Sequence, residues 1–238
     1  MGIPTIFDLL DRLAFLRGAP SVTIVLVAAF AAVALWDARL TLPALLIHYL
    51  IVGLLFVDML DPRLAVVHVL AGLFITLMML VTARQVNWGR PPTGSPAEDA
   101  PQPHRLKPGR LHITDRHLLR LGLAVLVLAA ALWPDFLTGP SAAFLPGVVP
   151  EDLAHIRPAI IGLAAMGLVG LSTTTEPLPA GIGLLLLLSG FSLFYGFLDQ
   201  SLAMTVTLII IQLAVALVIG YLAQAHFLPA GAAVEALD

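Results

Sequence analysis

Residues 177–224 read PLPAGIGLLLLLSGFSLFYGFLDQSLAMTVTLIIIQLAVALVIGYLAQ, two long apolar runs divided by the short polar link LDQS. Each run is close to the ~20 residues that an α-helix needs to cross ~30 Å of hydrocarbon. Inside a bilayer, the backbone N–H and C=O groups of such a run can be satisfied only by a helix or a closed barrel. This segment therefore predicts a hairpin of two membrane helices.

The composition of the whole chain agrees with this prediction. Of its 238 residues 59% are hydrophobic and 11% are charged, and the mean hydropathy is +0.98, whereas soluble domains are about half apolar and about a quarter charged. The chain has no cysteine, which excludes disulfides, thiolate catalysis and cysteine-held metal centres. A net charge of −3 gives no reason to expect a nucleic acid as partner.

The apolar runs predict an all-α, polytopic transmembrane protein with about seven spans. Residues 1–19 predict a short amphipathic helix that lies in the membrane interface or packs on a neighbouring helix. Segment 84–117, rich in Pro, Gly and charge, predicts a polar loop, residues 138–157 an external loop, and residues 223–238 a tail. The expected spans are 20–36, 40–60, 62–83, 118–137, 158–172, 178–197 and 201–222.

The distribution of Lys and Arg predicts the orientation of these spans. Cytoplasmic loops of membrane proteins carry an excess of Lys and Arg, so we expect segment 84–117 to be cytoplasmic. The amino terminus is then outside and the carboxyl terminus inside. The basic region 84–120 could also bind anionic lipid headgroups or a cytoplasmic partner. Seven of the 12 Lys and Arg residues lie there: Arg84, Arg90, Arg105, Lys107, Arg110, Arg116 and Arg120.

The first three spans and the last three share a sequence frame. Leu-Pro-Ala occurs at 42–44 and again at 178–180, and Leu-Asp occurs at 60–61 and again at 198–199. Similar composition among Leu-, Ala- and Gly-rich helices is the alternative explanation, although it does not account for the shared Pro and Asp. The frame predicts a duplicated three-helix unit.

We interpret residues 20–83 and 158–222 as two three-helix repeats joined by a linking helix at 118–137. One span between them makes both triplets enter the membrane from the same face, as do parallel repeats related by an axis along the membrane normal. In this frame Leu-Asp marks the start of the third helix of each repeat. Leu-Pro-Ala marks the start of the middle helix.

The second repeat resembles a known family. Its middle helix carries Gly-Leu-x(4)-Ser-Gly-x-x-Leu from Gly183 to Leu193, which is similar to the three-helix K-type subunit of bacterial complex I. The C subunit of multisubunit sodium/proton antiporters and the E subunit of hydrogenase-4 complexes are relatives of that subunit, and the seven-span build is nearer the latter. The resemblance implies a place among other integral membrane subunits of an ion-translocating assembly.

One departure from that family affects the expected role. K-type subunits are known for glutamates inside their second and third helices, which belong to the proton path. The sixth and seventh spans contain no carboxylate, and Glu176 lies at a cytoplasmic end. The corresponding depths of the first repeat hold His48 and His68 instead. The resemblance therefore implies a packing role, with any proton path built from different residues.

His48 is the polar residue nearest the middle of a predicted span. A charged Arg, Lys or Asp at the bilayer centre costs about 2.5 kcal/mol or more, so polar residues at that depth are functional candidates. A neutral imidazole can bond a backbone carbonyl, relay a proton or ligate a tetrapyrrole. Ala44 and Val52, one turn either side, leave room for a macrocycle, as in antenna-type bacteriochlorophyll sites. We expect no other cofactor and no metal.

Asp58, Asp61 and His68 form a second polar group near the outer surface. Asp58 and Asp61 are three residues apart on one helical face, and His68 follows two turns into the next span. The group could be the mouth of a proton or cation pathway. Alternatively, Asp61 and the proline after it simply start the third span, because Asp at N-cap and Pro at N1 is a favoured pairing. Asp199 would do the same in the second repeat, and Glu176 completes the pathway candidates.

Small residues at one-turn spacing predict close helix contacts, because they let two backbones approach within a membrane. The candidates are Ala28, Ala32, Gly183, Gly190, Ser192 and Gly196.

The sequence favours a non-catalytic membrane subunit of an ion-translocating assembly, since self-contained pumps need titrating groups at mid-membrane and few are present here. A stand-alone small transporter or channel is the first alternative, and a haem- or pigment-binding protein that uses His48 is the second.

Overall fold

The computed structural model describes residues 14–35, 37–60, 62–88, 115–133 and 148–227, and all regular structure in these ranges is helical. The all-α prediction is thereby confirmed. The long helices are α2 (Ala19–Ala34), α3 (Ala38–Met59), α4 (Pro62–Gln85), α5 (Asp115–Leu132), α6 (Arg157–Thr173), α7 (Pro177–Leu198) and α8 (Leu202–Phe227); two short 3₁₀ helices are η1 (Ala14–Leu16) and η2 (Glu151–Ile156).

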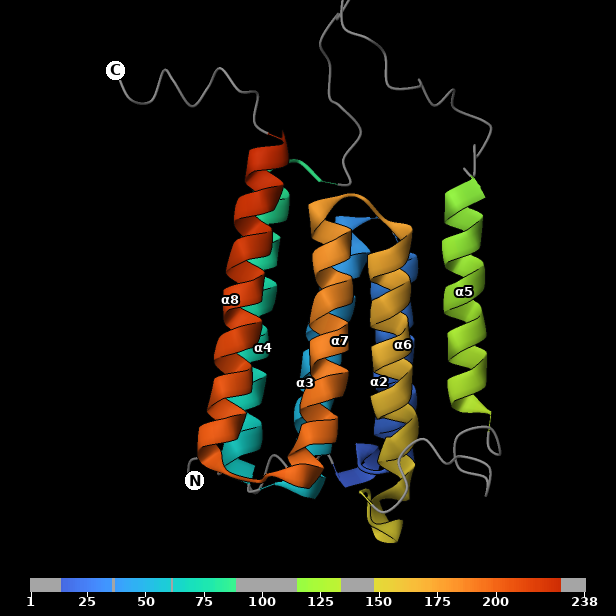
Figure 1. The fold of residues 1–238 in the computed structure, drawn as a ribbon, viewed down its shortest axis with the longest axis vertical. Coiled ribbons are helices and arrows are strands. Elements are labelled where there is room, and N and C mark those ends of the chain that lie inside the picture. The colour runs from blue at the N-terminus through green and yellow to red at the C-terminus, as the bar shows by residue number, and fades with distance from the viewer. Residues whose placement is uncertain (1–13, 36, 61, 89–114, 134–147, 228–238) are drawn as a thin grey trace, which may run out of the picture.

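The long helices form two layers of three, with α5 beside them (Figure 1). One layer is α2, α3 and α4 in that order, and the other is α6, α7 and α8. Helix α2 packs on α6, α3 on α7 and α4 on α8, while α5 packs on α6 and α2. Both triplets run up, down and up in Figure 1, so each helix pair across the layers is parallel.

The bundle has two ends, named here after the acidic residue that each one holds. The Asp199 end is at the bottom of Figure 1, where α3, α5 and α7 finish and α4 and α8 begin. The Glu176 end is at the top, where α6 passes into α7.

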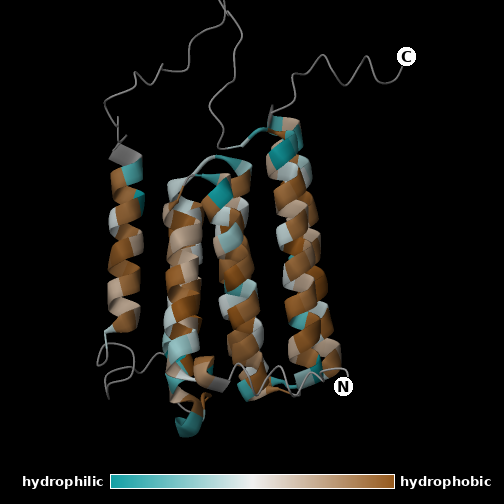
Figure 2. Cartoon of the chain, turned by 180° about the vertical axis from the view of Figure 1, so that it is seen from behind, coloured by the Kyte–Doolittle hydropathy of each residue, from teal (hydrophilic) through white to brown (hydrophobic). Residues whose placement is uncertain are grey.

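Hydrophobic residues make up most of the length of the helices (Figure 2). Five helical segments are long and apolar enough to cross a membrane: 38–59, 62–85, 151–173, 177–198 and 202–226. Helix α2 and residues 117–132 of α5 are apolar but shorter. Outward-facing leucines and phenylalanines, such as Leu73 and Phe74 on α4, are about half exposed. The protein is therefore a helical protein embedded in a membrane.

Glycines bring α6 and α7 into close contact. A Cβ atom at Gly183 would lie 2.8 Å from the backbone nitrogen of Leu171 and 2.9 Å from the carbonyl oxygen of Gly167. A Cβ at Gly190 would lie 3.0 Å from the carbonyl oxygen of Ile160. Since only glycine fits there, these two positions set the separation of the two helices.

Local capping explains where the helices start, with one difference from the sequence prediction. The Asp37 side chain accepts a 2.9 Å hydrogen bond from the backbone N–H of Arg39, so α3 begins at Ala38 and Pro43 lies inside it. The first Leu-Pro-Ala is therefore not a helix start, whereas the second lies in the first turn of α7. An N-cap Asp upstream starts the first copy earlier.

Both Leu-Asp sites precede helices, but the predicted N-cap role of Asp199 is taken by Ser201. Helix α4 begins at Pro62, directly after Asp61, which lies outside the described residues. In the second copy Asp199 accepts hydrogen bonds from the Ser201 backbone N–H (2.8 Å) and hydroxyl (3.0 Å). Ser201 Oγ accepts from the N–H of Met204 at 3.3 Å. Ser201 thus caps α8, and Asp199 orients that cap.

Candidate functional site

A buried cluster of two histidines and one tyrosine lies where α3 meets α4 and α7. His48 and Tyr49 come from the middle of α3, and His68 comes from the second turn of α4. Their exposed fractions are 0%, 1% and 2%. The Tyr49 ring neighbours both histidine rings, with ring centroids 5.2 Å from His48 and 6.1 Å from His68.

Packing holds these rings in place. Helix α4 can approach α3 here because Gly72 faces the Tyr49 side chain, where a Cβ atom would clash with the ring. The rings of Phe56 and His68 have centroids 4.6 Å apart. Aromatic pairs at such distances stabilise by about 0.5–1.5 kcal/mol beyond their buried area. The orientation of His68 is therefore set by its neighbours on α3.

The cluster contains polar atoms without hydrogen-bond partners among the described residues. These are both ring nitrogens of His48, the Tyr49 hydroxyl and Nε2 of His68. The Tyr49 hydroxyl faces Ser189 on α7 without completing a hydrogen bond of normal geometry. About 90% or more of buried polar groups in proteins are paired, and an unpaired one costs about 1–3 kcal/mol. Such atoms need a function or a water molecule to account for them.

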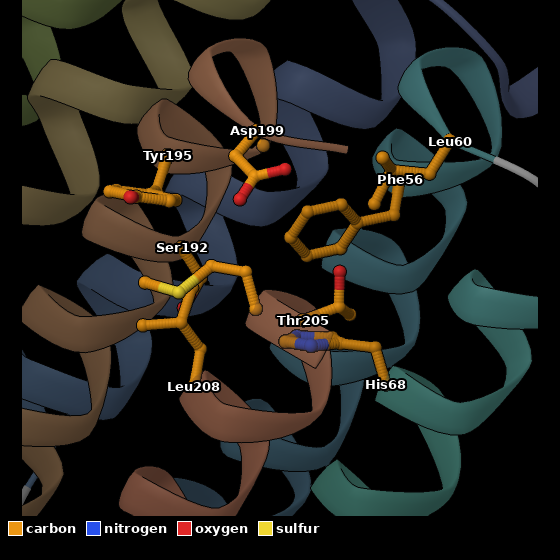
Figure 3. A pocket seen from close by; sticks show the side chains of 10 residues that line it. Phe56, Leu60, His68, Ser192, Tyr195, Asp199, Thr205 and Leu208 are labelled. Atoms are coloured by element: carbon orange, nitrogen blue, oxygen red, sulfur yellow. The ribbon is translucent and has the colours of Figure 1, made fainter. Parts of the chain in front are cut away.

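A small cavity connects His68 with the Asp199 end of the bundle (Figure 3). Its volume of about 10 Å³ is that of one water-sized probe. In Figure 3 the Asp199 carboxylate, the Thr205 hydroxyl and the His68 ring face the same space. The cavity is lined by Phe56, Leu60, His68, Ser192, Tyr195, Gly196, Asp199, Met204, Thr205 and Leu208.

The polar side chains of α7 and α8 around this cavity are paired. The Gln212 amide donates to Ser192 Oγ at 2.9 Å, and Ser192 donates to the Leu188 carbonyl at 2.8 Å. Thr205 donates to the Ser201 carbonyl at 3.2 Å. These residues join α7 to α8 and form a polar wall, and they do not titrate in the physiological range. The titratable groups of the cluster come from α3 and α4.

Toward the Glu176 end, the interior beyond His48 is apolar. The polar residue one turn past Gly72 is Thr76, which donates its hydroxyl to the Gly72 carbonyl of its own helix at 2.8 Å. The side chains that fill this part of the interface are at most 4% exposed: Leu42, Leu45, Ile75, Met79, Ile182 and Leu185. The cluster is accordingly open to polar contacts on one side and closed by hydrocarbon on the other.

Asp58 lies at the Asp199 end but does not line the cavity with His68. Its carboxylate pairs with Arg17, whose Nε donates at 2.7 Å. The pair links the segment before α2 to the end of α3. Exposed ion pairs of this kind contribute about 0–1 kcal/mol. Asp58 therefore pairs with Arg17 and does not join His68 at the cavity. Asp61, the third member of the expected group, lies outside the described residues.

Glu176 lies at the opposite end from the cavity. It is the residue before α7, and its carboxylate accepts a 3.3 Å hydrogen bond from the Trp88 indole. Arg120 of α5, 4% exposed, is near enough to interact electrostatically with it. Burial of Arg120 beside a carboxylate fits a charge that needs a partner in apolar surroundings. Glu176 thus ties α7 to the end of α4 and to α5.

The predicted packing residues are all buried, and four of them are seen at contacts between helices. Ala28 and Ala32 are buried on α2. Gly183 and Gly190 face α6, and a Cβ at Gly196 would lie 3.2 Å from the Met59 side chain of α3. Ser192 takes part in the hydrogen bond from α8 described above.

Tyr49 is the member of the cluster that the sequence analysis did not select. An aromatic residue in an apolar run is most often core, and Tyr49 does fill the core as one of the largest fully buried side chains. Its hydroxyl at mid-span beside a histidine was the available signal. Within the described ranges there is no group of three or more His, Asp or Glu residues that could hold a metal ion.

Comparison of the chain with family models, with curated proteins and with solved structures found no significant match.

Proposed function

We propose that this protein is a non-catalytic integral membrane subunit of an ion-translocating assembly of the complex I, antiporter or hydrogenase kind, and that it contributes a proton-binding cluster. The observation that carries the proposal is the group His48, Tyr49 and His68, which are buried together with unpaired polar atoms. The identity of the assembly follows from the resemblance of residues 177–224 to the K-type subunit.

Proton transfer is the chemistry that best fits this cluster. Imidazole takes up and releases protons near neutral pH, and a phenol hydroxyl both donates and accepts a hydrogen bond. Tyr49, whose ring neighbours both histidines, can therefore pass a proton from one to the other. Intramembrane ionisable residues that face the bundle interior are typical of proton relays.

The small number of buried charges supports a subunit over a self-contained pump. Among the described residues, no Asp or Glu side chain is fully buried, although Asp58 and Glu176 sit at the two ends. A pump that works alone needs its own titrating groups on both sides of the membrane centre. The apolar outer faces of α4 and α8 suit lipid or the helices of larger subunits.

The membrane arrangement belongs to the same proposal. All seven long helices cross the membrane, the two triplets are parallel repeats, and α5 is the linking span. The parallel directions of α2–α4 and α6–α8 support this. The amino terminus is outside and the carboxyl terminus is cytoplasmic, which places the basic region 84–120, largely outside the described residues, beside a cytoplasmic partner or anionic lipid.

The test is purification from native membranes in mild detergent, with partner identification and proton-flux measurements on the same complex. We expect larger membrane subunits to co-purify, and the variant His48→Gln to lower proton flux about a hundredfold, within the range for loss of a proton-transfer group. His117→Gln, at an exposed position of α5, is the control and should leave flux unchanged. Purification without partners, or full flux in His48→Gln, contradicts the proposal.

A stand-alone transporter is the second candidate, favoured by the stacking of α2 on α6, α3 on α7 and α4 on α8. Flux through liposomes that contain this chain alone would establish it. A tetrapyrrole on His48 would have to displace neighbouring side chains, because His48 is 0% exposed. A visible absorption band that disappears in His48→Leu would establish that third role.

A further inference from the structure

We infer that the cluster exchanges its proton with one side of the membrane only, through the cavity at the Asp199 end, and that His48 is the closed inner terminus of this route. The inference deepens the proposed function and rests on it for the identity of the ion. Access from one side only is inferred from the cavity that reaches His68 and from the apolar side chains beyond His48.

The polar groups of the route follow one another inward from the Asp199 end. Asp199 directly follows the last residue of α7 and is partly exposed. The cavity then offers the Thr205 hydroxyl and the Ser192 hydroxyl, and its inner wall is His68. A water molecule that fits in this space can hydrogen-bond to several of these groups, which is the condition for stable buried water.

The depths of the three rings match a stepwise path. At 1.5 Å per residue, His68 lies about 9 Å along α4 from its first residue, Pro62. Tyr49 lies about 15 Å, and His48 about 16 Å, along α3 from its last residue, Met59. His68 therefore lies about 6 Å nearer the Asp199 end than Tyr49 does.

Each proton-transfer step conserves charge. A proton from the cavity adds to the free Nε2 of His68 and forms an imidazolium. His68 then passes a proton to the oxygen of Tyr49 while the Tyr49 hydroxyl gives its own proton to His48. His68 and Tyr49 return to neutral, and His48 carries the charge. One bridging water or a small ring rotation spans the distances.

A cavity of about 340 Å³ opens at the Glu176 end between α3 and α4, but its lining ends at Pro43 and Leu80, and none of the three rings lines it. Two of the buried hydroxyls toward that end are bonded to backbone carbonyls: Thr41 donates to Leu35 at 3.1 Å and Thr76 to Gly72. A third, Thr82, faces Gly220 of α8. From Leu45 to Leu42 on α3, the core side chains are apolar and almost fully buried. A proton that reaches His48 must return the same way or pass to a partner after a change in the structure.

The charged and titratable groups around the cavity define the mouth. Asp199 and Tyr195 come from α7, none comes from the described part of α8, and Asp58 of α3 is already paired with Arg17. Asp199 is therefore the one carboxylate of the described residues that lines the cavity, and it raises the local concentration of cations at the mouth.

The absence of cysteine in the chain permits a direct test with single-cysteine variants. Thr205→Cys and Thr76→Cys replace threonines of similar exposure, 9% and 7%, with a side chain of similar size. Thr205 lines the cavity, whereas Thr76 lies beyond the cluster toward the Glu176 end. The full chain is placed in right-side-out and inverted membrane vesicles. Silver ion, a small cation that binds thiolates, is then added outside, and the remaining thiols are counted with a maleimide dye after denaturation.

We expect silver added on the Asp199 side to block the thiol of Thr205→Cys against the dye at least tenfold faster than silver added on the other side. The thiol of Thr76→Cys should still react with the dye after silver is added on either side. Protection of Thr76→Cys from the Glu176 side would overturn the closed inner end. Equal rates for Thr205→Cys from both sides, or none from the Asp199 side, would overturn one-sided access.

The labelling needs neither a partner nor ion flux, so its failure is separable from failure of the proposed function.

A second measurement follows proton uptake directly. Asp199→Asn removes the charge and keeps one of the two oxygens that accept hydrogen bonds from Ser201, and proton uptake from the Asp199 side should slow about tenfold. Asp58→Asn at the same end is the matched control and should leave uptake unchanged. Equal uptake in both variants would remove Asp199 from the route.

Discussion

The two three-helix groups of this molecule have the same order and direction but different chemistry. In the α3–α4 half, His48, Tyr49 and His68 carry titratable groups with unpaired atoms. In the α7–α8 half, Ser192 and Gln212 are bonded to each other, and both are fully or almost fully buried. The offset of the Leu-Asp sites, from 60–61 to 198–199, pairs His68 with Val206.

This contrast shows that two three-helix groups of the same order and direction can differ in chemistry. Both halves have small residues at helix contacts, such as Gly72 and Gly183, whereas the first Leu-Pro-Ala lies inside α3 and only the second lies at a helix start. Titratable groups are needed only where a function uses them, because each one is costly in a membrane interior. One half can therefore hold the site while the other supplies its wall.

The largest expected effect on proton uptake comes from removal of the Tyr49 hydroxyl. Tyr49→Phe keeps the ring beside the two histidines and removes the hydroxyl, so proton uptake by the complex should fall about a hundredfold. The melting temperature of the purified protein should stay equal or rise, because a buried hydroxyl without a partner is lost.

Tyr221→Phe, in the α7–α8 half, is the control, since Tyr221 is exposed on α8 and does not line the cavity. Unchanged uptake in Tyr49→Phe would show that the contrast between the two halves is one of packing alone.

A glycine in each half gives the next largest effect. Gly183→Ala places a Cβ 2.8 Å from the backbone of α6, and backbone cannot move aside as a side chain can. Overpacking of this kind costs typically about 1–3 kcal/mol. In Gly53→Ala the nearest atom belongs to the Val69 side chain, which can rotate, so the loss should be smaller.

Thermal unfolding of both variants in detergent, followed by size-exclusion profiles, measures the difference. Equal loss in the two variants would argue that α6 and α7 are held less closely than the structure has them.

The smallest effect belongs to the hydrogen bond between α7 and α8. Gln212→Leu combined with Ser192→Ala in a double-mutant cycle should give a coupling energy of about 0.6–1.7 kcal/mol, the range for hydrogen bonds between membrane helices. Unfolding by a denaturing detergent would measure it. Proton uptake should change little in Gln212→Leu, and a hundredfold drop would assign Gln212 to the route itself.

Much of the fold could be predicted from the sequence, and much less of the site. The seven expected spans correspond to α2 to α8, and the start of α4 after Leu-Asp lies where the pattern put it. His48 and His68 were selected as candidates from their depth. The start of α3 was misplaced, because Asp37 caps the helix before Leu-Pro-Ala is reached.

The sequence does not predict which side chains contact the candidate site residues. Asp58 was grouped with His68 by spacing along the chain, yet its carboxylate pairs with Arg17, 41 residues away. The apolar run around Tyr49 predicts only a core residue. Its position beside two histidines in the fold makes its hydroxyl a candidate for proton transfer. Most of these helices are apolar on every side, so no polar face marks which residues turn inward.

The sequence by itself determined that this is a helical membrane protein and where most of its helices begin and end. Apolar length and local capping decide those features, and both act within a few residues of chain. Only the tertiary structure decided that Tyr49 neighbours both His48 and His68, and that the cavity beside His68 leads to Asp199. These depend on how far each helix is rotated about its axis and shifted along it, which is set by small residues such as Gly72 and Gly183 at contacts between helices.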